Sequence, residues 1–150
     1  MKTTRLVISL FCLTTFAALV PPLHAAERTE ITGILISASN QRGESDRRLA
    51  SYEPTLRRIL RFESYRYLGE GDASLGVPAR GNISLGDGHR LEVETERAEG
   101  SAIHLRVTWE ARGRPLMNTS LILRPGVPAV LGGPSTGKPG EVFAVILVGR

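Results

Sequence analysis

The segment from Ile103 to Glu110 restricts the fold more than any other part of the sequence. Apolar and polar side chains alternate along it without interruption, in the order Ile103, His104, Leu105, Arg106, Val107, Thr108, Trp109, Glu110. Successive side chains of a β-strand point to opposite faces of its sheet. We therefore expect a strand with one face against a core and the other face in solvent.

Further strands are predicted on both sides of this segment. Residues 31–39 and 142–148 are continuous apolar runs, which is typical of buried strands. Shorter strands are expected at residues 64–68, 82–85, 89–95, 117–123 and 129–131. Their order favours antiparallel pairing of neighbours along the chain.

One helix is expected between the first two strands. Asp46 can cap it, and apolar residues then recur at helical spacing. They are Leu49, Tyr52, Leu56, Ile59 and Leu60. Pro54 falls inside this pattern, so either the helix kinks there or a short turn precedes a helix that starts near Pro54. We therefore predict an α+β fold, in which one N-terminal helix packs on a mainly antiparallel sheet.

The turn Gly86-Asp87-Gly88 allows two hairpin registers. A two-residue turn at Asp87-Gly88 pairs Leu85 with Arg90 and mixes the apolar and polar faces. A three-residue loop pairs Ile83 with Leu91 and Leu85 with His89, which keeps the apolar face together. It also places Gly88 at the left-handed position, so we predict the three-residue loop.

The first 25 residues have the pattern of a secretory signal peptide. Lys2 and Arg5 precede the uncharged apolar run of residues 6–20, and small residues follow. We expect cleavage after Ala25, with the bond after Ala26 as the alternative and a retained membrane anchor as the other interpretation. Residues 26–150 are then expected to form a single exported α+β domain, periplasmic or secreted, with no transmembrane segment.

Composition limits the chemistry of that domain. The only cysteine, Cys12, lies within the predicted signal peptide, so no disulfide and no thiolate site is expected after cleavage. Removal of residues 1–25 takes away two basic residues and no acidic one, so the formal charge of +4 falls to +2. The basic residues, almost all arginine, are not interleaved with exposed aromatic residues, and we expect no nucleic-acid partner.

The stretch GGPSTGKP at residues 132–139 matches most of a phosphate-binding loop. In that loop a Ser or Thr after the lysine holds magnesium and a helix starts directly behind it. Here Pro139 follows Lys138, and a predicted strand follows Gly140. We interpret the stretch as a Gly/Pro-rich hairpin loop.

Two groups of ionisable residues are candidates for a site. Glu92, Glu94, His89 and His104 lie on neighbouring predicted strands and could serve a small hydrolase or a ligand-binding site. The alternative is surface pairing, in which Glu92 and Glu94 lie near Arg106 and His104 across the sheet. No third clear ligand joins the two histidines, and we expect no metal site, no cofactor and no catalytic residue.

The second group is basic and lies around the predicted helix. It consists of Arg47, Arg48, Arg57, Arg58 and Arg61. Such a face could attach to an anionic lipid or polymer of a cell envelope. The alternative is a solvated helix face paired to Glu53 and Glu63.

Several short motifs resemble those of small exported proteins of Gram-negative bacteria, a family with no established activity. The motifs are Ser37-Ala38-Ser39-Asn40, Leu56-Arg57-Arg58 leading into Ser64-Tyr65-Arg66, Asn118-Thr119-Ser120-Leu121, and Leu131-Gly132-Gly133-Pro134. The resemblance implies that the GGP segment is a structural turn. Residues 117–133 also resemble, locally, the strand–Pro-Gly–strand–Gly-Gly pattern near the end of secretin channel domains, which does not imply a pore.

These observations favour a non-enzymatic binding or assembly module of the cell envelope. The expected partner is an envelope or secretion-system protein, and pairing at a strand edge is the expected mode of contact. The hydrolase or ligand-binding site and the electrostatic attachment remain as alternatives.

Overall fold

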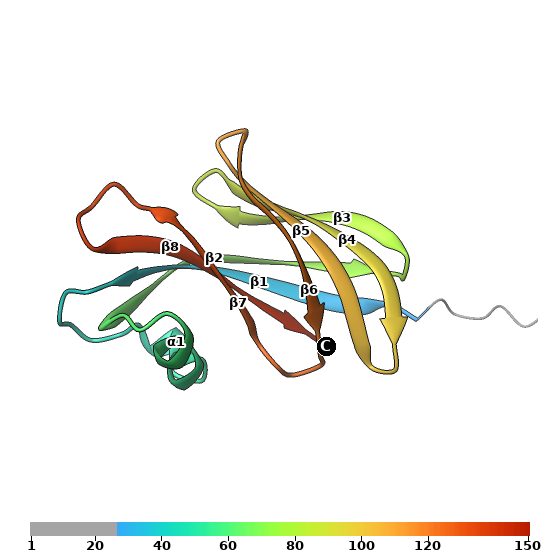
Figure 1. The fold of residues 1–150 in the computed structure, drawn as a ribbon, viewed down its shortest axis with the longest axis horizontal. Helices are drawn as coiled ribbons and strands as arrows, with labels where there is room; N and C mark the ends of the chain where they lie inside the picture. Colours follow the sequence, from blue (N-terminus) through green and yellow to red (C-terminus); the bar gives the residue numbers. More distant parts are fainter. Residues whose placement is uncertain (1–26) are drawn as a thin grey trace, which may run out of the picture.

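The computed structural model describes residues 27–150; the predicted signal peptide lies outside this range. Within it the chain forms eight strands and two short helical segments (Figure 1). In order they are β1 (Thr29–Ser39), η1 (Arg47–Leu49), α1 (Glu53–Ile59), β2 (Ser64–Leu75), β3 (Ala79–Gly86), β4 (His89–Glu99), β5 (Ala102–Ala111), β6 (Arg114–Leu123), β7 (Ala129–Ser135) and β8 (Glu141–Gly149).

The strands form two four-stranded antiparallel sheets. The first sheet has the order β2-β1-β8-β7, and the second has the order β3-β4-β5-β6. The predicted α+β fold is therefore wrong, because the layer that packs on the first sheet's inner face is a second sheet. The chain passes from one sheet to the other twice, between β2 and β3 and between β6 and β7. The alternation of side chains within a strand does not show to which sheet that strand belongs, so the sequence did not predict two sheets.

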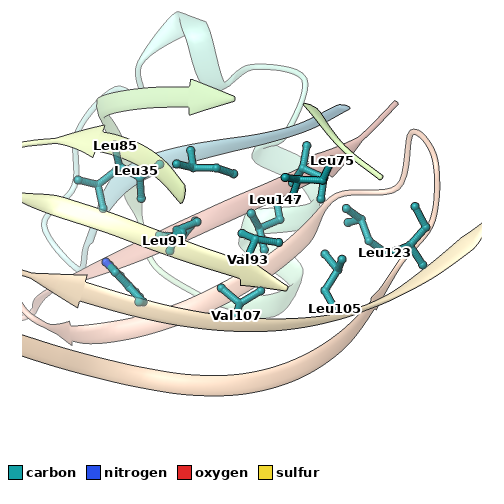
Figure 2. Packing of buried hydrophobic residues seen from close by; sticks show 14 residues of the cluster. Leu35, Leu75, Leu85, Leu91, Val93, Leu105, Val107, Leu123 and Leu147 are labelled. Atoms are coloured by element: carbon teal, nitrogen blue, oxygen red, sulfur yellow. The ribbon is translucent and has the colours of Figure 1, made fainter. Parts of the chain in front are cut away.

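Side chains from the two sheets meet in one apolar core. Leu35, Leu75 and Leu147 of the first sheet face Leu91, Val107 and other residues of the second (Figure 2). The alternation predicted for residues 103–110 is confirmed, since Ile103, Leu105, Val107 and Trp109 are all buried. Burial of each such side chain contributes about 1.5–3 kcal/mol.

The first sheet is buried on its outer face as well. Ile34, Ile36, Ala144 and Ile146 of the central strands β1 and β8 form a second cluster there. The helical segment supplies the cover, and Figure 1 shows α1 on the side of this sheet turned away from β3–β6. Burial on both faces is the reason why β1 and β8 are continuous apolar runs.

The helical segment follows the second of the two predicted alternatives. A 3₁₀ turn at η1 precedes α1, and Pro54 lies in the first turn of α1. The Asp46 side chain accepts from the backbone N–H of Arg48 at 3.0 Å and so caps η1. Leu49 and Leu56 are buried, whereas Ile59 is 48% exposed. Ile59 shares the predicted helical spacing with Leu56, but it is the last residue of α1 and its side chain is not covered.

The β3–β4 hairpin differs in one detail from the predicted register. Ile83 pairs with Leu91, as predicted, but His89 pairs with Gly86 and not with Leu85. The extra residue is a bulge in β3, and Asp87 and Gly88 make a two-residue turn with positive φ. The bulge restores the common apolar face that a regular two-residue hairpin would have lost.

The backbones of β2 and β3 touch across the two sheets. A Cβ atom at Gly69 would overlap the carbonyl oxygen of Leu85, and one at Gly71 would overlap that of Ser84. The crossover between these strands is held by buried Thr95, whose hydroxyl accepts from Ala79 N at 2.8 Å and donates to Gly76 O at 2.6 Å. Residues 69–75 were not predicted as strand, because Gly and Asp are infrequent in strands.

We expect Gly71→Ala to destabilise the protein by about 1–3 kcal/mol, because the new methyl group forces β2 away from β3. The matched control is Gly76→Ala, since a Cβ at Gly76 meets no atom within 4 Å. Chemical denaturation of both variants measures the difference. Equal stability of the two variants would contradict the close approach of β2 and β3.

Candidate functional site

The predicted basic group is partly neutralised by its neighbours. Arg48 pairs with Asp46 at 2.8 Å (Nη2–Oδ2), and its guanidinium lies 3.9 Å from the centre of the Tyr67 ring. The hydrogen bonds from Arg48 lower the pKa of Asp46. Arg57 pairs with Glu53 one helical turn away, at 2.7 Å (Nη2–Oε1).

Three members of the basic group have no such pair. Arg47, Arg58 and Arg61 are exposed and form no ion pair with another described residue. The structure therefore leaves three of the five predicted arginines available to an anionic partner.

The predicted glutamate and histidine group is not brought together. Glu92 and Glu94 lie on the outer face of the second sheet, where Arg80 of β3 contacts them at 3.8 Å and 3.0 Å. His104 lies on the outer face of β5 and contacts Glu99 at 3.2 Å. His89 has the opposite orientation and is buried between the sheets.

The prediction of surface pairing is confirmed for the position of Glu94 across from Arg106, but the ion pairs that form are different ones. Glu94 is opposite Arg106 in the register, yet Arg106 forms its ion pair with Glu96 at 2.8 Å. A bulge between Thr95 and Arg97 moves Arg97 opposite His104. Among the described residues no group of three or more His, Cys, Asp or Glu side chains could hold a metal ion.

His89 is the polar side chain that the sequence reasoning misplaced. It is only 5% exposed, and its Nδ1 accepts from the indole Nε1–H of Trp109 at 3.1 Å. Its ring lies 4.7 Å from that of Phe143, between ring centres. The signal was available, because His89 shares strand parity with the buried Leu91 and Val93.

Hydrogen bonding to Trp109 determines the tautomer of His89. A nitrogen that accepts a hydrogen bond carries no proton, so in the neutral ring Nε2 carries it. Nε2 has no partner among the described residues, and none of their side-chain nitrogen or oxygen atoms is both fully buried and unpaired. The Nε2–H group therefore reaches solvent at the surface that His89 lines.

That surface is a cleft of about 340 Å³, which we call the hairpin-end cleft. Its walls are Asp87, His89, Ala111, Arg112, Leu116, Pro134, Ser135, Thr136 and Phe143. They come from the β3–β4 turn with the start of β4, from the β5–β6 hairpin, from the end of β7 with the loop that follows, and from the start of β8. The cleft continues past Asp87, Thr136 and Phe143 into a hollow of about 190 Å³ that reaches Arg66 and Lys138.

The GGPSTGKP stretch helps to build this cleft. Residues 132–135 belong to β7, so the predicted hairpin loop is confirmed only for residues 136–140. Strand β8 follows the loop, where a phosphate-binding loop would have a helix. A Cβ atom at Gly133 would overlap the six-membered ring of Trp109. Gly133 therefore makes room for the indole that holds His89.

A larger cleft of about 600 Å³ lies at the other end of the two sheets. Its charged walls are Glu27, Arg28, Glu96 and Arg97, which balance in sign. The hairpin-end cleft is the better candidate because it contains the solvent-facing donor of a largely buried side chain, His89, whose orientation is fixed by Trp109.

No protein-family model, no curated protein and no solved structure matches the chain. Among residues 27–150 no helix is both long and apolar enough to span a bilayer.

We expect stability to fall as the pH drops below about 6.5, the ordinary pKa of histidine. Burial and the nearby Arg112 lower the pKa of His89, and Asp87 opposes them. The unfolded chain therefore binds the proton first, so this contribution is fully present above about pH 6.5 and is lost as the pH falls toward the lowered pKa.

Thermal unfolding of the wild type and of His89→Gln between pH 7.5 and 5 measures this dependence. The variant lacks the titrating ring, so its stability should depend less on pH, whatever its stability at pH 7.5. If the melting temperatures of the two proteins fall in parallel as the pH is lowered, His89 is not the group responsible for the loss of stability.

Proposed function

We propose that residues 26–150 form an exported, non-enzymatic binding or assembly module of a bacterial cell envelope. Export rests on the signal-peptide pattern of residues 1–25. A binding role is favoured over a hydrolase because Glu92, Glu94 and His104 lie on the outer sheet face while His89 lies on the inner one.

The observation that carries the proposal is the free edge of β6. Each sheet has two edge strands, and three of the four edges are protected. β2 and β3 cover each other through the glycine contacts. β7 is only seven residues long and carries Pro134 and a register shift after Gly132.

β6 lacks these protections over most of its length. From Leu116 to Leu123 it has no charged residue and no proline, and its register with β5 is continuous from Met117 onward. Leu116 and Ile122 are 36% and 46% exposed. Natural proteins usually block such an edge with a charge, a proline or a bulge, because its free backbone groups pair with another strand.

The proposed occupant of this edge is an extended, uncharged segment of another envelope protein. Strand addition takes its affinity from main-chain hydrogen bonds and its specificity from the side chains on either face. An uncharged edge discriminates against charged segments, since a charge buried beside it would lack a partner. This is the strand-edge contact that the sequence predicts.

Attachment to an anionic surface is a second candidate. It is favoured by the exposure of Arg47, Arg58 and Arg61 without ion pairs to described residues. Binding of this kind weakens as ionic strength rises. Binding to anionic vesicles that is unaffected by salt would contradict it.

We expect Thr119→Lys to reduce binding of the envelope partner by about tenfold or more. Thr119 lies opposite the buried Val107 on the inner face of β6, so a strand added at this edge would have to pack its inward-facing side chains beside an unpaired charge. The control Ser74→Lys adds the same charge to β2 and should leave binding unchanged. Affinity is measured on the partner captured by crosslinking in the native cell.

Equal binding of both variants would contradict docking at β6. The mass of the purified domain in solution separates two kinds of occupant. A dimer that Thr119→Lys dissociates would identify the occupant as a second copy of this chain and not as another protein.

A further inference from the structure

The free edge of β6 leads directly into the hairpin-end cleft. Leu116 belongs to both, as an exposed residue near the start of β6 and as a wall of the cleft. An extended segment paired with β6 would therefore run into the cleft at this end of the strand.

Among the donors that line the cleft, the His89 imidazole is the one held in a fixed orientation by buried neighbours. The Nε2–H of His89 is held in place because Trp109 occupies Nδ1 and the Phe143 ring packs against the imidazole. Leu116, Pro134 and Phe143 supply apolar walls around this donor. A group that fits must present an acceptor to Nε2–H and an apolar surface to the walls.

The charges at the cleft oppose one another. Asp87 and Arg112 both line it, so a net negative or positive ligand meets one like charge as well as one opposite charge. A dipolar group without net charge meets both favourably, since its acceptor can face Arg112 and its donor can face Asp87. A peptide unit has this character.

We propose that the hairpin-end cleft binds one apolar residue of a peptide segment, with a backbone carbonyl of that residue accepting from His89 Nε2–H and its side chain packed against Leu116, Pro134 and Phe143. This inference rests on strand addition at β6. It names the subsite that selects one side chain of the added segment. Selection of an apolar residue here adds specificity to the main-chain pairing, which is tolerant of sequence.

The probe for this subsite is N-acetyl-leucine methylamide, which carries the carbonyl, the amide and the apolar side chain. It is titrated to millimolar concentration into ¹⁵N-labelled protein of residues 26–150. The Nε2 resonance of His89 and the indole N–H of Trp109 should shift together in a saturable manner. N-acetyl-aspartate methylamide should cause no saturable shift, and the free acid N-acetyl-leucine should bind more weakly than the amide.

Two variants identify the cleft as the site. Leu116→Glu places a carboxylate in the wall and should weaken binding of the probe by about tenfold, and it should fold because Leu116 is 36% exposed. Val127→Glu is the matched control, since Val127 is 55% exposed and lies outside the cleft. It should leave the titration unchanged.

The outcomes separate this inference from the proposed function. If N-acetyl-leucine methylamide shifts neither His89 nor Trp109, or if the free acid binds better than the amide, the peptide subsite is overturned. If the probe fails in this way but Thr119→Lys still loses binding of the partner, strand addition at β6 remains supported and only the subsite is wrong. If Thr119→Lys also binds its partner normally, both proposals fail.

Discussion

The contact between the backbones of β2 and β3 determines how the two sheets are joined. It requires Gly69 and Gly71, because a side chain at either position would overlap a carbonyl oxygen of β3. The two edges meet side by side and protect each other from other strands. On the opposite side β6 pairs only with β5 and β7 only with β8, and of these two edges β7 is short and interrupted by Pro134 and a register shift, which leaves β6 as the free edge.

The first sheet is the central layer of the structure and is covered on both faces. Its central strands are apolar on both faces, because one face packs on the second sheet and the other on η1 and α1. Neither cover can leave without exposing one of these faces to water. The residues free to contact a partner are consequently on the outer face and the β6 edge of the second sheet, on the hairpin ends and on the arginine-rich outer surface of the helical segment.

The sequence predicted single elements better than their assembly. Alternation placed β5 and its buried face correctly, and the hairpin argument found the Ile83–Leu91 pair. The extension of β2 beyond Leu68 was not predicted, because its glycines resemble a loop locally and the contact that requires them is with β3, the next strand, which belongs to the other sheet. The same limit applies to the site: the parity of His89 indicates burial, but its bond to Trp109 depends on Gly133, forty-four positions further along.

A photo-crosslinking residue at position 118, compared with position 82, tests the central claim most directly. Asn118 and Asn82 are both exposed asparagines on edge strands of the second sheet, in β6 and β3. In the native cell we predict a defined adduct with one envelope protein, or with a second copy of this chain, from position 118 and none from position 82. An adduct from position 82 alone, or equal adducts from both positions, would contradict docking at the free edge of β6.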